Sequence, residues 1–182
     1  MKSSNYIFKI NLTAVMVALT CILTMAVRIP SPTKGYLNLG DCAVLFGGWL
    51  LGPVWGAIAG GVGSSLADFL SGYPVYIPAT MIIKALMALI ISLVPYFFNP
   101  RKKSHSRVGF LVCSIIAEIL MVAGYYLFEA VFIGEGFVPA LAGVSGNTVQ
   151  GTAGIIASYF LVEIFSRTGI IKKVQQTDFE RK

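Results

Sequence analysis

The sequence predicts an all-α membrane protein, built as one integral domain over residues 1–182 with a bundle of six transmembrane helices. Hydrophobic residues make up 56% of the chain and charged residues only 12%, about half the charged fraction of a soluble domain. The apolar residues stand in long blocks separated by short turns containing Gly and Pro, as in membrane-spanning helices. The basic residues, which give a net charge of +6, gather on alternate loops. This distribution favours an oriented membrane protein in contact with lipid over a protein that binds nucleic acid.

The predicted spans follow the apolar blocks in order. The first ends before Arg28, Pro30 and Pro32, and it lacks a small-residue cleavage site, so it is expected to remain as a helix. The second is shorter than the roughly 20 residues that cover the hydrocarbon core. It crosses fully, forms a half-span, or joins the third as a broken hairpin. The many Gly and Ser residues of the third let helices pack closely. The fourth begins after Pro74, and the sixth opens at Pro139. The six ranges are 9–27, 40–51, 54–70, 77–98, 108–133 and 139–165.

The charges on the loops predict the orientation of the chain. Six spans place both ends on one side of the membrane. Of the 14 Lys and Arg residues, 11 lie on that side, in the N-terminus, the loop 101–107 and the tail from Arg167. Only Arg28 and Lys34 lie in the loops of the other side. Because basic residues favour the cytoplasmic side, we expect a multi-pass protein of the cell membrane with cytoplasmic N- and C-termini.

Several polar residues stand inside the apolar blocks. Lys84 is roughly 10 Å below the outer face, at a rise of about 1.5 Å per residue. Three polar residues of the fifth span are separated by seven and four positions and share one helix face, and two in the sixth span are three apart. These residues are Glu118, Tyr125, Glu129, Asn147 and Gln150. With apolar surroundings, they predict a pocket for a small polar aromatic ligand in the outer half of the membrane.

These residues also have other interpretations. Lys84 either contacts a ligand or forms an ion pair with Asp68 or Glu118, because charges inside a membrane usually find a partner. Glu118 could instead carry protons in a stand-alone proton-coupled carrier. Asn147 could serve only to join helices. A scaffold membrane protein without a ligand is a third hypothesis.

No catalytic residue, metal site or cofactor is predicted. Ser64 and Ser65 have no His in a span to activate them, and His105 with three scattered cysteines does not suggest zinc. The chain contains no phosphate-binding GxxxxGK[ST] motif. Transport driven by ATP would therefore need another subunit.

A family resemblance follows from local motifs. The first span carries Ala14 and Ala18 in an AxxxA pattern, LNLGD occupies residues 37–41, and DFLSGYPVYIPATMIIKALMALI occupies 68–90. In these motifs, its size and its six spans, the chain resembles the substrate-binding S component of an energy-coupling factor (ECF) vitamin transporter. It is most similar to the riboflavin-type subgroup, and within it to members assigned to hydroxymethylpyrimidine or pyridoxine.

The resemblance implies a function and partners. Such a subunit binds its vitamin with high affinity at the outer side, here hydroxymethylpyrimidine, pyridoxine or another vitamin such as riboflavin. It then docks on a membrane coupling protein (T component) driven by two cytoplasmic ATPase subunits, and it delivers the substrate by toppling in the membrane. Ala14 and Ala18 correspond to the docking strip. The loop 28–39 corresponds to a lid, which adds Tyr36 and Asn38 to the expected site, together with Tyr76 in the turn before the fourth span.

Overall fold

The computed structural model describes residues 2–27, 29–30, 36–94 and 106–167, and this part of the chain is almost entirely helical, as predicted. The helices are α1 (Lys2–Ala26), α2 (Gly40–Leu51), α3 (Pro53–Ser71), α4 (Ile77–Ser92), α6 (Arg107–Leu127) and α7 (Phe137–Arg167). Shorter elements are β1 (Ile29–Pro30), β2 (Tyr36–Leu37), η1 (Pro74–Tyr76) and η2 (Phe128–Phe132). The predicted end of the fourth span beyond 94, most of the basic loop, Arg28, Lys34 and the tail after Arg167 lie outside the described residues.

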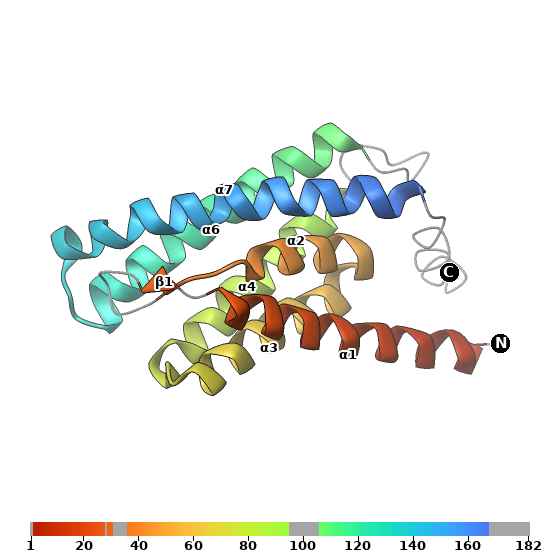
Figure 1. The fold of residues 1–182 in the computed structure, drawn as a ribbon, viewed down its shortest axis with the longest axis horizontal. Coiled ribbons are helices and arrows are strands. Elements are labelled where there is room, and N and C mark those ends of the chain that lie inside the picture. The colour runs from red at the N-terminus through yellow and green to blue at the C-terminus, as the bar shows by residue number, and fades with distance from the viewer. Residues whose placement is uncertain (1, 28, 31–35, 95–105, 168–182) are drawn as a thin grey trace.

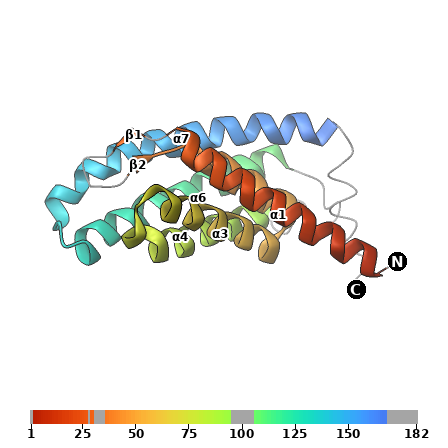
Figure 2. The same cartoon turned by 60° about the horizontal axis from the view of Figure 1, so that its bottom comes forward.

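Helix α2 is central, and each of its residues is buried. Helix α3 packs against α1 and α4, while α6 packs against α4 and α7. Figures 1 and 2 show α1 and α3 on one side of the bundle and α6 and α7 running along the other. Helix α1 begins and α7 ends at the same end of the bundle, and the turn between α6 and α7 lies at the opposite end.

Four helical stretches in the described part of the chain are long and apolar enough to cross a membrane: Tyr6–Ala26, Pro74–Ser92, Arg107–Phe132 and Phe137–Arg167. Helix α2 has 12 residues and is therefore about 18 Å long, which is less than the hydrocarbon thickness of about 30 Å. Helix α3 has 19 residues, but Gly and Ser interrupt its apolar character. The predicted count of six spans thus depends on α2 and α3 in addition to these four.

Glycines allow α2 to occupy the centre. A methyl group on Gly48 would lie 2.6 Å from the carbonyl oxygen of Ala88 in α4, and one on Gly56 would lie 2.6 Å from the Gly48 Cα. On the other side of α3, a methyl group on Gly63 would lie 2.7 Å from the carbonyl oxygen of Val17 in α1. Backbone-to-backbone contact of this kind is how small residues hold helices together in a membrane.

The loop after α1 forms a small hairpin. Strands β1 and β2 are antiparallel, with Ile29 opposite Leu37 and Pro30 opposite Tyr36. The side chain of Leu37 lies close to Gly146 of α7, where a methyl group would come within 2.9 Å of it. The loop predicted as a lid therefore contacts α7.

The predicted fifth span, 108–133, changes helix type before its end. Residues Phe128–Phe132 form a single π-helical turn, in which the Ile133 N–H donates to the Phe128 carbonyl oxygen at 3.1 Å. Gly134 and Gly136 then reverse the chain with positive φ angles of 80° and 84°, a conformation that Gly adopts without strain. The wider turn leaves Glu129 buried, and π-helical turns of this kind are frequent at functional sites.

The close contact between α2 and α4 gives a test of the packing. We expect Gly48→Ala to lower the free energy of unfolding by about 1–3 kcal/mol, because its methyl group would overlap the α4 backbone. Gly47→Ala is the matched control, since a methyl group there would meet only the flexible end of Met16, at 3.1 Å. Thermal unfolding of both purified variants in detergent measures the difference. Equal stability of the two would contradict this packing.

Candidate ligand-binding site

A buried ion pair lies at the centre of the polar residues. The Lys84 ammonium of α4 contacts Asp41 Oδ1 in the first turn of α2, and the two side chains are 3% and 0% exposed. Of the two interpretations left open for Lys84, the ion pair with Asp68 or Glu118 is wrong, because Lys84 pairs with Asp41. The reason is that α2 enters the centre of the bundle with its N-terminus facing α4, where a helix N-terminus also stabilises the Asp41 carboxylate.

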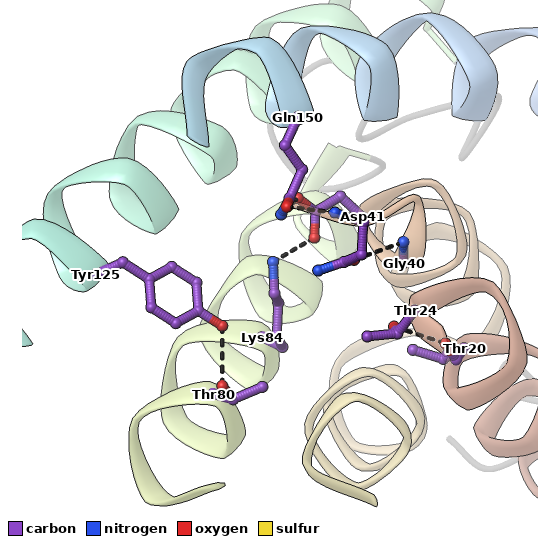
Figure 3. A network of polar contacts seen from close by, with 9 residues as sticks. Thr20, Thr24, Gly40, Asp41, Thr80, Lys84, Tyr125 and Gln150 are labelled. Atoms are coloured by element: carbon purple, nitrogen blue, oxygen red, sulfur yellow. Dashed lines mark hydrogen bonds and ion pairs between the residues drawn. The ribbon is translucent and has the colours of Figure 1, made fainter. Parts of the chain in front are cut away.

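Gln150 of α7 binds the second carboxyl oxygen of Asp41. Its Nε2 donates to Asp41 Oδ2 at 2.7 Å, and its Oε1 accepts the backbone N–H of Asn38 at 2.8 Å. The Asn38 side chain in turn accepts the N–H of Gly40 at 2.8 Å. Figure 3 shows Gln150, Asp41 and Lys84 converging between three helices. The loop after α1 is thereby joined to α2, α4 and α7.

Tyrosines extend this network toward the turn end of the bundle. The Lys84 ammonium lies 5.5 Å from the centre of the Tyr125 ring, within cation–π range. The Tyr125 hydroxyl shares a 3.0 Å hydrogen bond with Thr80 (Figure 3). The Tyr76 ring lies 6.4 Å from that of Tyr125, and its hydroxyl donates to Glu129 Oε1 at 3.4 Å. A continuous line of polar and aromatic groups therefore runs from Glu129 to Asn38.

Glu118 of α6 lies beside this line, and only 5% of the residue is exposed. Its carboxyl group contacts Gly151 and Gly154 of α7. A methyl group on Gly151 would lie 2.8 Å from Oε2, and one on Gly154 would lie 3.2 Å from Oε1. The same methyl group on Gly154 would be 2.8 Å from the Cβ of Asp41. Among the described residues, neither oxygen of Glu118 has a hydrogen-bond partner.

A cavity of about 520 Å³ opens between α6 and α7, within the range of small-molecule pockets. Glu118 forms part of its lining, and most of the remaining wall is apolar. The other lining residues are Ile115, Ile119, Val122, Ala123, Tyr126, Val144, Thr148, Gly151, Thr152 and Ile155. Glu118 thus lines the cavity, and Gly154 lies close both to its carboxyl group and to Asp41 of the ion pair.

Comparison with known proteins shows the family. A sequence model described as ECF-type riboflavin transporter, S component, matches residues 4–167. The chain belongs to this family. It is therefore a membrane subunit of a vitamin transporter and not a catalytic enzyme.

Two known proteins are similar in sequence to this S component. An uncharacterized protein of Pyrococcus woesei is 38% identical over 136 residues, which cover 74% of this chain and 86% of the relative. The thiamine precursor transporter HmpT of Lactococcus lactis is 28% identical over 165 residues, which cover 90% of each chain.

The structure of the S component brings most of the expected site residues together. Those in the polar line or directly beside it are Lys84, Tyr125, Glu129, Gln150, Glu118, Asn38 and Tyr76. Asn147 is half-buried one turn before Gln150, and its side chain makes no hydrogen bond to any described residue. The backbone of Tyr36 pairs in β2, while its side chain lies outside the described part.

Two site residues were not predicted. Asp41 stands in the LNLGD motif, and Thr80 in the fourth span, but neither was assigned a role. The signal for Asp41 was a carboxylate in an apolar segment directly after a Gly, the position of a helix start. That signal shows a costly buried charge, but not which of the distant lysines and amides lies beside it.

The ion pair predicts a specific stability pattern. Lys84→Met should lower the free energy of unfolding by about 3–5 kcal/mol, because Asp41 would keep a buried charge without its cation. The double variant Lys84→Met/Asp41→Asn should recover most of that loss, since the amide is neutral. Thermal unfolding in detergent measures both. A double variant that is less stable than Lys84→Met would contradict the pairing.

Proposed function

We propose that this S component binds hydroxymethylpyrimidine or pyridoxine with high affinity at the end of the bundle where α6 turns into α7. The observation that carries the proposal is the line of buried polar and aromatic groups from Glu129 to Asn38. It offers ring faces for stacking and polar groups for hydroxyls and a ring nitrogen. The relative HmpT, described as a thiamine precursor transporter, supports a small heterocycle over a large one such as riboflavin.

The proposed topology is a single domain, residues 1–182, of the six-helix S-component type. Its spans are those predicted from the apolar blocks, with α2 and α3 as the second and third. Both termini are cytoplasmic in this proposal. The common position of the start of α1 and the end of α7 supports it (Figure 1), as do the basic residues concentrated near those ends.

The proposed partners are a T component and two ATPase subunits, which supply the energy. The S component would topple in the membrane to release its vitamin inward. Ala14 and Ala18 are exposed on α1, next to Val15 and Leu19, which are also exposed. These exposed residues are small or apolar, which suits close contact with another membrane helix.

Binding of radiolabelled vitamins to the purified protein tests the substrate. We expect saturable binding of hydroxymethylpyrimidine or pyridoxine and much weaker binding of riboflavin. Asn147→Ala should weaken binding by about tenfold through the loss of a ligand hydrogen bond. Its thermal unfolding should stay unchanged, because the Asn147 side chain has no hydrogen bond to a described residue. Absence of saturable binding of all three vitamins would refute the proposed function.

Docking is tested by uptake in cells that supply the energy-coupling subunits. Ala14→Trp and Ala18→Trp should leave vitamin binding intact and abolish uptake, because an indole would hold the two helices apart. Ile82→Trp, at an exposed position on α4, is the control and should transport normally. Normal uptake by both alanine variants would exclude α1 as the docking face.

A stand-alone proton-coupled carrier is the second candidate. The buried Glu118, which has no hydrogen-bond partner in the part of the chain that the structure describes, favours it. That function predicts uptake into liposomes that contain this chain alone and carry a pH gradient. It further predicts that Glu118→Gln abolishes such uptake. The transporter complex proposed above predicts no uptake without the ATPase subunits.

A further inference from the structure

Two arginines from different helices meet on one carboxylate at the end of the bundle opposite the α6–α7 turn. Arg107 begins α6, and Arg167 ends α7. Each donates from its Nη2 to Glu163 Oε1, at 3.0 and 2.9 Å. Because both nitrogens lie within 3.0 Å of one oxygen, the two guanidinium groups are neighbours. Together they carry one positive charge more than Glu163 neutralises.

The two guanidinium groups keep most of their hydrogen-bond donors. A guanidinium has five N–H donors. Among the described residues, each of these two donates only to Glu163, and the arginine side chains are 68% and 76% exposed. Such exposed ion pairs contribute little to stability. They do hold the two groups side by side, where the oxygens of one phosphate group can accept hydrogen bonds from both.

The position of the two arginines along the chain places them at a membrane boundary. Arg107 is the first residue of one candidate membrane span, and Arg167 is the last residue of another. Basic side chains at the end of a span lie at the level of the lipid headgroups, because the hydrocarbon core excludes them. The phosphate groups of lipids are therefore the anions that these guanidinium groups meet first.

Apolar side chains continue from the arginines toward the centre of the bundle. On α6 two of them follow Arg107 by four and eight positions, and on α7 two precede Arg167 by seven and eleven, so each pair shares one helix face. These four exposed residues are Leu111, Ile115, Phe160 and Ile156. The two lines begin at neighbouring guanidinium groups and follow helices that pack together, which suits the acyl chains of a lipid.

We propose that this end of the bundle binds a single anionic phospholipid from the leaflet next to the start of α1 and the end of α7. The phosphate accepts from both Arg107 and Arg167, and an acyl chain lies along Leu111 and Phe160. Phosphatidylglycerol is preferred over phosphatidylcholine, because choline would bring a further cation beside two arginines. The site is separate from the polar line of the proposed function, so lipid and vitamin do not compete.

Native mass spectrometry of the purified full-length chain in detergent tests this site, with dioleoylphosphatidylglycerol and dioleoylphosphatidylcholine as probes. The native chain should bind one phosphatidylglycerol about 10-fold more tightly than phosphatidylcholine. Arg107→Gln/Arg167→Gln should weaken phosphatidylglycerol binding by about 10- to 100-fold and remove the preference, as for the loss of hydrogen bonds to a charged group. Lys172→Gln/Lys173→Gln is the matched control. It removes the same charge from the C-terminal tail and should bind as the native chain does.

A pair of phenylalanines tests the contact with the acyl chain. Phe160→Ala should weaken phosphatidylglycerol binding by about 3- to 10-fold, because it removes apolar area from that contact. Phe132→Ala, at an exposed position near the opposite end of the bundle, should leave binding unchanged. A large excess of inorganic phosphate should not displace the lipid, since phosphate alone lacks the apolar part.

The outcomes distinguish a lipid site from weaker alternatives. Equal losses in the arginine and lysine variants, or no preference for phosphatidylglycerol in the native chain, would show attraction to net charge only and overturn a defined site. Displacement by inorganic phosphate, or native affinity in Phe160→Ala, would overturn a lipid as the occupant and leave a site for small anions. None of these results bears on vitamin binding, which the radiolabelled vitamins test separately.

Discussion

The buried ion pair between Lys84 and Asp41 is the interaction on which the structure depends. A buried ion pair is stable only if its remaining hydrogen-bonding groups are satisfied, because removing each ion from water costs several kcal/mol. Gln150 and the start of α2 meet that need for Asp41. The pair therefore requires α2, α4 and α7 to meet at one point, which leaves few alternative arrangements of these helices.

That meeting point is possible because α2 carries Gly48 at the position where its backbone touches the backbones of α3 and α4. Gly48 contacts the α4 backbone, and Gly56 of α3 contacts Gly48. Removal of either close approach would move α2 outward and carry Asp41 away from Lys84. Packing and electrostatics in this bundle are thus coupled, and the small residues act on the site although none of them carries a polar side chain.

The network also connects the loop after α1 to the interior. Gln150 accepts the backbone N–H of Asn38 with one end of its amide and donates to Asp41 with the other. A change in the charge or position of Asp41 would therefore alter the hydrogen bond between Gln150 and the Asn38 backbone, although Asp41 does not bind the loop directly. Glu118 lies beside this network and lines the cavity of α6 and α7.

The sequence by itself determined the class of the protein and most of its helical segments, and it singled out polar residues that the structure brings together, because long apolar blocks and charges inside them have few physical solutions in a membrane. It placed Lys84, Tyr125, Glu129 and Gln150 in the outer half of the membrane from helical rise alone. Only the tertiary structure decided that Lys84 pairs with Asp41, that the end of α6 widens into a π turn, and that Glu118 has no hydrogen-bond partner among the described residues. The ion pair and its link to Asn38 depend on contacts between residues 43 to 112 positions apart in the chain, which periodicity along one helix does not encode.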